Sequence, residues 1–244
     1  MIPFDIYNPK DTQKPKLLLL PGAGVLDTFS HQYAVLAEKY QIFICHLPGC
    51  GERTDAEYSP DKTVGDIVEL AESLGGNIAL AGHSLGAQTA VRLVCKRPDL
   101  FTKAVFLSRL ALRNENSIEM YAKISKMMAV MLKSRQLVTL QGKYWGFTRR
   151  QTERMAEYLQ SITPTVYSSF FKNTLDICEM PEYPDVKVPM LAVCGLNEVT
   201  DMKKSLRLLS ENKNCRCFIL PKTNHDFPMR NPEKINPLLV KFLS

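Results

Sequence analysis

The feature that most constrains this chain is the pentapeptide Gly-His-Ser-Leu-Gly at positions 82–86. An apolar run over 77–81 precedes it, and a helical pattern over 87–96 follows it. A serine between two glycines in a strand–turn–helix setting is typical of a nucleophile elbow, a strained turn that exposes the serine hydroxyl. Glycine is needed on both sides because a side chain there would collide with the neighbouring strand or helix. Ser84 is therefore a candidate nucleophile.

Short apolar runs alternate with longer amphipathic stretches along most of the chain. This alternation predicts an α/β fold with a mostly parallel sheet of about seven strands and helices on both faces. The expected strands are 4–7, 16–20, 41–46, 77–82, 103–108, 189–194 and 215–220. The expected helices are 29–40, one opened by a capping box at Thr63 to Asp66 and ending near 75–76, 87–96, and 202–211.

The alternation breaks between about 110 and 185, where only helical signals occur. We expect three helices there: 118–133, one opened by the capping box Thr148-x-x-Gln151, and one that begins at Pro164. The chain would then consist of a core in two parts, 1–109 and 186–244, with an inserted helical cap at 110–185. One group of cap side chains is expected to line an adaptable apolar pocket or to pack the cap onto the core: Met120, Met127, Met128, Met131, Tyr144, Trp145 and Phe147.

A serine nucleophile needs a general base, and the chain contains four histidines. His225 follows Ser84 in the sequence and lies just beyond the last expected strand, at the carboxyl end of the sheet where open α/β folds build their sites. His31 and His46 precede Ser84, and His83 lies within the elbow, where the turn directs it away from the serine. His225 is therefore the candidate base.

The third group of such a triad is a carboxylate that orients the histidine and stabilises its cation. Glu198 closely follows the expected strand 189–194, and Asp201 is the near alternative. Either acid can perform this role, and the position of Glu198 three residues after Gly195 favours it.

An oxyanion hole needs two backbone N–H groups, one after the nucleophile and one from a loop after an early strand. Leu85 supplies the first. Ala23 can supply the second, because the glycines beside it in the loop 21–24 let the backbone approach a substrate closely. A glycine-rich loop can also cradle phosphate, but the Lys-Ser/Thr of a P-loop and the G-x-G-x-x-G spacing are both missing here.

Composition narrows the expected partners and compartment. The 31 Lys and Arg against 25 Asp and Glu give a charge of +6, and their distribution over helix faces predicts a solvated surface, not a nucleic-acid-binding stripe. Seven cysteines, several within apolar runs, are typical of a reducing compartment, and the pair Cys215-x-Cys217 lacks metal-ligand spacing. No stretch approaches the roughly 18 apolar residues of a membrane span, and no signal peptide precedes the first strand. A cytoplasmic protein without a membrane span is expected.

The glycine-rich loop at 21–24, a His-Leu-Pro-Gly turn at 46–49, the elbow, Glu198 after a glycine, and His225 form one assembled pattern. This pattern resembles the α/β-hydrolase family over almost the whole chain except the cap. The resemblance implies an α/β-hydrolase fold, a triad of Ser84, Glu198 and His225, and oxyanion donors at Ala23 and Leu85. It implies no metal and no organic cofactor.

Many members of that family are esterases, lipases, thioesterases or carbon–carbon bond hydrolases. We therefore expect a serine hydrolase that cleaves a small-molecule carboxylic ester or thioester, with a largely apolar acyl group, through an acyl-serine intermediate. Two alternatives remain open: a ligand receptor on the same fold with little turnover, and a lyase or acyltransferase that uses the same triad.

Overall fold

The computed structural model describes residues 1–113 and 115–244. Seven strands form one sheet in the order β1-β3-β2-β4-β5-β6-β7, in which β1 runs antiparallel to β3 and the other neighbours are parallel. The strands are β1 Phe4–Ile6, β2 Lys16–Leu20, β3 Gln41–Cys45, β4 Ile78–His83, β5 Phe101–Leu107, β6 Met190–Gly195 and β7 Cys215–Leu220. The predicted sheet is confirmed, including its short first strand.

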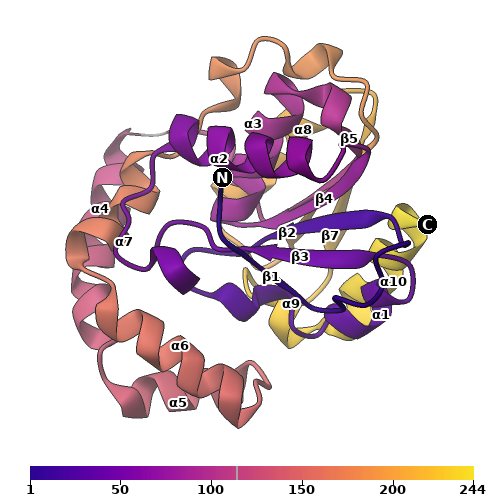
Figure 1. Cartoon of the computed structure of the whole chain (residues 1–244). Coiled ribbons are helices and arrows are strands. Elements are labelled where there is room, and N and C mark those ends of the chain that lie inside the picture. The colour runs from indigo at the N-terminus through magenta and orange to yellow at the C-terminus, as the bar shows by residue number, and fades with distance from the viewer. Residues whose placement is uncertain (114) are drawn as a thin grey trace.

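Helices cover both faces of this sheet (Figure 1). α2 and α3 lie over one face, and α1 and α10 lie over the other. α8 packs against β6 and β7. The bounds are α1 Tyr33–Ala37, α2 Pro60–Ser73, α3 Leu85–Lys96, α8 Thr200–Leu209, α9 Phe227–Arg230 and α10 Pro232–Leu243.

The centre of the core is formed by β2 and β4. Every side chain over 17–20 and 78–81 is fully buried, because helices cover these strands on both faces. A strand buried on both faces has a continuous apolar sequence in place of alternation, which is what these two segments show. The turns that follow β2 and β4 therefore start from a rigid base.

Two predicted helix starts were wrong. α2 begins at Pro60, with Ser59 as its N-cap, and the Thr63 N–H donates to the Ser59 carbonyl within the first turn. Proline at the first helical position fixes a suitable φ, and the Asp66 carboxylate pairs with Arg53 and forms no capping box. The helix expected over 29–40 also starts later and is shorter, because Leu26–Phe29 forms a 3₁₀ turn and α1 begins at Tyr33.

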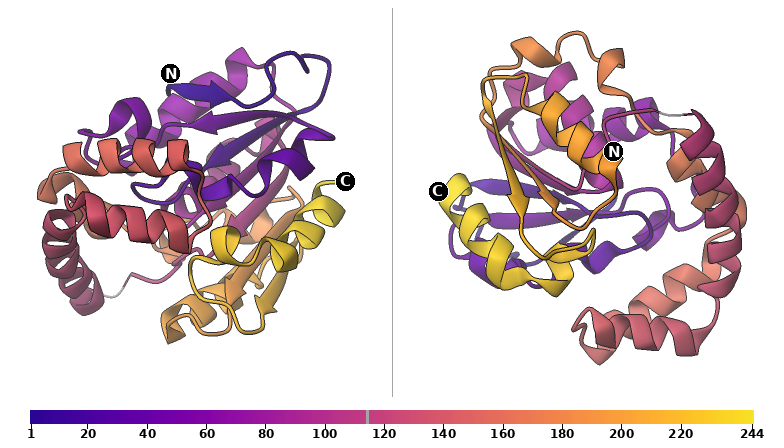
Figure 2. Two further views of the ribbon diagram at one scale, coloured as in Figure 1. Left: turned by 90° about the horizontal axis from the view of Figure 1, so that it is seen from below. Right: turned by 180° about the vertical axis from the view of Figure 1, so that it is seen from behind.

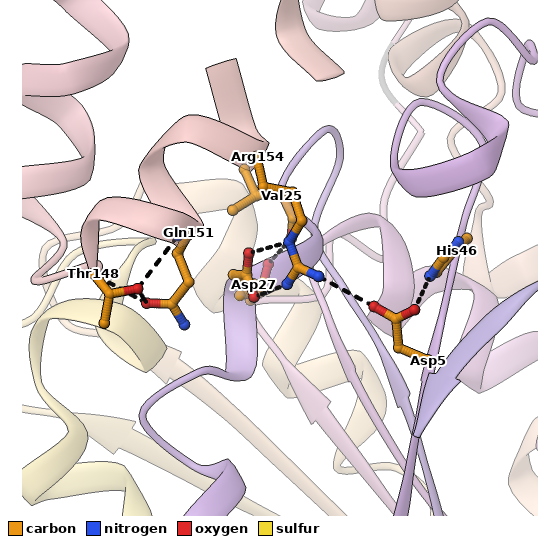
Figure 3. Close-up of polar contacts among 8 residues, drawn as sticks. Asp5, Val25, Asp27, His46, Thr148, Gln151 and Arg154 are labelled. Carbon is orange, nitrogen blue, oxygen red and sulfur yellow. Dashed lines mark hydrogen bonds and ion pairs between the residues drawn. The ribbon is translucent and has the colours of Figure 1, made fainter. Parts of the chain in front are cut away.

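The segment between β5 and β6 contains four helices where three are expected. They are α4 Glu115–Met131, α5 Arg135–Tyr144, α6 Arg149–Ser161 and α7 Pro164–Lys172. The capping box of Thr148 and Gln151 is confirmed, and its bonds appear in Figure 3. Thr163 caps α7 as expected. Figure 2 shows that the four helices gather on one side of the molecule, away from the C-terminal helix.

Candidate active site

Ser84 occupies the turn between β4 and α3 with φ of +53° and ψ of −114°. Such angles are rare for a residue with a side chain and indicate strain at a functional turn. A Cβ atom at position 82 would lie 2.3 Å from the carbonyl oxygen of Gly86, and one at position 86 would lie 2.0 Å from that of Leu20. Close packing therefore requires glycine on both sides of the serine.

Ser84, His225 and Glu198 form a hydrogen-bonded chain at the carboxyl edge of the sheet. Ser84 Oγ lies 3.0 Å from His225 Nε2, and His225 Nδ1 lies 2.8 Å from Glu198 Oε2. When Nδ1–H donates to the carboxylate, Nε2 is left to accept the serine hydroxyl proton. The structure thus brings together the three residues that the sequence proposes as a triad.

The Glu198 carboxylate is buried and accepts two further hydrogen bonds. The Gly195 N–H donates at 2.6 Å and the Ser108 hydroxyl donates at 2.8 Å. Burial acts to raise the pKa of Glu198, but His225 and these two donors hold that pKa below its ordinary range. The group is therefore ionised at neutral pH, the state that stabilises a histidine cation.

Asp201, the alternative acid, lies on α8 and pairs with Lys204 at 3.2 Å. The loops after β6 and β7 are joined by a hydrogen bond from the Asn197 N–H to the Thr223 carbonyl at 3.0 Å. This contact holds the loop that carries Glu198 beside the histidine loop. Glu198, not Asp201, is the acid next to the histidine.

His83 contacts the backbone of the loop after β7, which carries His225. Its Nε2 lies 2.9 Å from the backbone carbonyl oxygen of His225. Burial lowers the pKa of His83 to about 3, so the imidazole is neutral and donates this hydrogen bond. The sequence correctly directs His83 away from Ser84 but gives no signal for this second contact.

The loop proposed to supply the second oxyanion donor is clamped by Thr28. The Thr28 hydroxyl accepts from the Gly22 N–H at 3.1 Å and donates to the Val25 carbonyl at 2.6 Å. Ala23, between these anchors, and Leu85, at the start of α3, both line the cavity that contains the candidate nucleophile. Their N–H groups remain candidate oxyanion donors.

A cavity of about 580 Å³ opens onto the triad, a volume suited to a small molecule. Among the described residues that line it there is no Lys or Arg, while Glu198, Asp201 and Asp226 contribute carboxyl groups. Most of its wall is apolar or aromatic: Leu110, Leu112, Ile118, Tyr121, Trp145, Tyr167, Phe170, Phe171, Met202 and Met229.

The prediction that methionine side chains of the cap line this cavity was wrong. α4 turns another face, which includes Ile118 and Ala122, toward α7 and the cavity. Of the aromatic residues proposed with the methionines, Trp145 lines the cavity, and its indole N–H donates to Asp226 at 3.0 Å. The methionines neither line the cavity nor pack onto the core, because all four are exposed: Met120, Met127, Met128 and Met131.

A family model described as "Alpha/beta hydrolase family" matches residues 17–238, which is most of the chain. The chain belongs to the α/β-hydrolase family. Its match spans the elbow, Glu198 and His225, and includes the inserted helices.

Three proteins similar to this α/β-hydrolase share between 13% and 21% of their residues with it. The (E)-2-((N-methylformamido)methylene)succinate hydrolase of Acinetobacter baylyi is 21% identical over 239 residues, covering 93% of this chain and 89% of that protein. The crystal structure of E-2-(acetamidomethylene)succinate hydrolase has a TM-score of 0.75 at 18% identity, covering 100% and 99%. A carboxylesterase structure from Nitrososphaera gargenis has a TM-score of 0.77 at 13% identity, covering 99% and 93%. These two structural likenesses establish the fold.

In this α/β-hydrolase, a charged cluster joins α6 to the 3₁₀ turn Leu26–Phe29, which follows the loop 21–24 (Figure 3). Arg154 Nε donates to Asp27 Oδ2 at 3.1 Å, Nη2 donates to Asp27 Oδ1, and Nη1 donates to Asp5 Oδ2 at 3.2 Å. Asp5 Oδ1 lies 3.3 Å from His46 Nε2. Burial raises the pKa of Asp27 against the opposing effect of Arg154. The sequence gives no sign of this cluster, because its members lie far apart in the chain.

Within residues 1–113 and 115–244, no three His, Cys, Asp or Glu side chains lie close enough together to hold a metal ion. In the same residues, no helix combines the length and the apolar character needed to cross a bilayer. All seven cysteines are free thiols.

Proposed function

We propose that this α/β-hydrolase cleaves a carboxylic ester or thioester with a small, largely apolar acyl group. The observation that carries the proposal is the continuous chain from Ser84 Oγ through His225 to Glu198, with distances of 3.0 Å and 2.8 Å. A serine hydroxyl is a weak nucleophile at neutral pH and becomes effective when an oriented histidine accepts its proton. The strained elbow presents that hydroxyl to the cavity.

In the proposed reaction, His225 Nε2 accepts the hydroxyl proton as Ser84 Oγ attacks the acyl carbon. The N–H groups of Ala23 and Leu85 donate to the oxyanion that forms. Collapse of this intermediate expels the alcohol or thiol, which takes the proton from His225 and leaves an acyl-serine. A water molecule, deprotonated by the same histidine, then releases the carboxylic acid and restores the Ser84 hydroxyl.

The charge of the cavity favours a neutral acyl group over a dicarboxylate. Two of the similar proteins are named as hydrolases of succinate derivatives, and succinate carries two carboxylates. A buried carboxylate needs a cationic or hydrogen-bonding partner. The described lining offers no Lys or Arg and already contains Asp201 and Asp226. An uncharged ester or thioester therefore fits this cavity better than those succinate derivatives do.

The test is stoichiometric reaction with a fluorophosphonate probe, followed by intact mass and peptide mapping. Wild-type protein is expected to be labelled at Ser84, and Ser84→Ala is expected to remain unlabelled. Glu198→Gln should react more slowly, on the order of 10³-fold, because the histidine is no longer held in the reactive tautomer. Ser210→Ala, an exposed serine distant from the triad, is the matched control and should label as wild type does.

Turnover of short-chain esters and thioesters by the same variants completes the test. Labelling of folded Ser84→Ala at the wild-type rate would overturn the proposed nucleophile. Labelling at Ser84 without turnover of any ester, but with turnover of an amide, would retain the triad and overturn the ester assignment. Absence of both labelling and turnover in the folded wild type would favour a ligand receptor.

A further inference from the structure

α4 is apolar on two opposite sides. Four residues spaced by four, three and four positions are buried, and the helix packs against α7: Ile118, Ala122, Ser125 and Ala129. A second set with the same spacing, displaced by two residues, is 44–61% exposed: Met120, Ile124, Met127 and Met131. Two residues correspond to about 200° around a helix, so the second set lies on the side opposite the packed one. A surface helix normally has a polar outer face.

α5 continues this pattern directly after α4. Leu137 and Leu140 are 43% and 62% exposed. The opposite side of α5 is packed on α6, where a Cβ atom at Gly142 would lie 2.4 Å from Thr152 Oγ1. The right view of Figure 2 places α4 and α5 at the outer margin of the molecule. We name the exposed set the apolar stripe: Met120, Ile124, Met127, Met131, Leu137 and Leu140.

The positive charge of the protein is concentrated around the apolar stripe. Residues 115–150 contain seven Lys and Arg against two Glu, so this segment carries +5 of the +6 of the chain. No Asp or Glu occurs between positions 120 and 152. Lys133, Arg135 and Lys143 are exposed. Four of the seven basic residues therefore belong to α4 and α5 themselves, while Lys133 lies between these helices and Arg149 and Arg150 begin α6.

We propose that α4 and α5 form a docking surface for the anionic face of a lipid bilayer. Basic side chains complement anionic headgroups, and their long apolar stems can extend along the boundary while the apolar stripe enters the acyl region. Protein–protein interfaces exclude lysine from their apolar centre. In the run 131–137, by contrast, Lys133 and Arg135 alternate with apolar and neutral residues. This interleaving favours a bilayer over a protein partner.

A second copy of this chain fits the surface poorly. A symmetric dimer through α4 and α5 would place the same basic segment of each copy face to face, and like charges across an interface oppose association. α4 also borders the catalytic cavity through Ile118 and Tyr121. A bilayer bound to the outer side of α4 would therefore lie about one helix diameter, ~10 Å, from that cavity.

The test is co-sedimentation with large unilamellar vesicles, either of phosphatidylcholine alone or of phosphatidylcholine with an equal amount of phosphatidylglycerol. Wild-type protein is expected to bind the anionic vesicles at least about tenfold more tightly than the neutral ones, with weaker binding as salt rises. Lys133→Glu/Lys143→Glu should reduce the binding roughly tenfold or more. Leu140→Asn with Met127→Asn should reduce it by about tenfold through lost apolar burial.

Matched controls are available on the rest of the surface. Lys187→Glu/Lys213→Glu makes the same charge change at two exposed lysines outside α4 and α5, and Val240→Asn removes an exposed apolar side chain from α10. Both controls should bind as wild type does. Equal losses in control and stripe variants, or wild-type binding no tighter to anionic than to neutral vesicles, would overturn the proposal.

Sedimentation velocity tests the alternative that a second copy of this chain occupies the apolar stripe. A dimer that Leu140→Asn dissociates would assign the apolar stripe to self-association and would overturn the bilayer assignment. The vesicle assay contains no substrate, so its outcome is independent of whether the protein hydrolyses an ester. Far-ultraviolet circular dichroism and a urea unfolding midpoint close to that of wild type verify that the stripe variants are folded.

Discussion

Individual residues outside the triad fix the position of the His225 backbone, and His83 is the clearest example. Its neutral imidazole donates to the His225 carbonyl at 2.9 Å. Because burial lowers the pKa of His83 to about 3, the folded protein resists its protonation. The unfolded chain takes up a proton near the ordinary histidine value of 6.5. Acidification between these two values therefore favours unfolding.

His83→Gln should remove this titration while keeping an N–H group that can reach the His225 carbonyl. In wild type, the free energy of unfolding should fall as pH drops from 6.5 toward 3, with a slope approaching ~1.4 kcal/mol per pH unit. The variant should lose less stability over the same interval. Urea unfolding of both proteins at about pH 7 and about pH 5 measures the difference. Parallel pH curves for the two proteins would contradict the assignment.

Gly86 allows the elbow to approach the start of the loop 21–24, which is proposed to supply an oxyanion donor. Its missing side chain leaves room for the Leu20 carbonyl, which would lie 2.0 Å from a Cβ atom. Gly86→Ala should push the two proposed oxyanion donors apart and slow fluorophosphonate labelling on the order of 10²-fold. Gly65→Ala is the control, since nothing lies within 4 Å of a Cβ atom there in α2. The control should label normally and gain about 0.5–1 kcal/mol in stability from helix propensity.

At the scale of elements, Arg154 links α6 to the 3₁₀ turn Leu26–Phe29, which follows the loop 21–24. Arg154→Met should leave the buried Asp27 carboxylate without its partner and cost on the order of 2 kcal/mol, a value reduced because Arg154 is partly exposed. It should also lower kcat more than it raises KM, because Asp27 adjoins Thr28, which clamps the loop.

Arg149→Met tests whether this effect is specific to the Arg154 position. Arg149 lies on the same helix and pairs with Glu153 at an exposed site, so its loss should change the free energy of unfolding much less than the loss of Arg154 does. Urea unfolding and steady-state kinetics of both variants provide the comparison. An equal effect of the two substitutions would show that the pair with Asp27 has no special role.

Elements differ in how well the sequence predicts them. The strands β2, β3, β4 and β6 are predictable because burial on both faces makes them largely apolar, and turn residues bound them. α10 was not predicted: Pro237 lies inside it, and local preference opposes a helix there, but burial of Ile235 and Leu239 against the core overrides that preference.

The residues of the candidate site also differ in how well the sequence predicts them. Ser84 and His225 are predictable because each carries a local signal, the glycine pair for the serine and the position after the last strand for the histidine. The contacts of His83 with His225 and of Arg154 with Asp27 join residues more than 120 positions apart. No local pattern specifies such a pair, since it depends on how the elements pack.

At the scale of the whole molecule, the chain has a net positive charge, whereas the charged side chains that line the described cavity are all acidic. The chain carries +6, and +5 of this belongs to the segment around the apolar stripe. The described cavity lining has no Lys or Arg and includes Asp201 and Asp226. This separation predicts that the charge of the acyl group, more than its length, decides which esters react.

A pair of esters of equal length, one ending in a methyl group and one in a carboxylate, tests this prediction. The neutral ester should have a kcat/KM at least about tenfold higher, because a carboxylate desolvated without a partner loses more than about 1.4 kcal/mol. Asp201→Asn and Asp226→Asn should bring the kcat/KM values of the two esters closer together, because each substitution removes a negative charge that repels the carboxylate. Asp61→Asn, at the exposed start of α2, should leave the ratio of the two kcat/KM values unchanged. Equal kcat/KM values for the two esters in wild type would show that the carboxylate finds a partner in the cavity, and the succinate derivatives would then become the better substrate class.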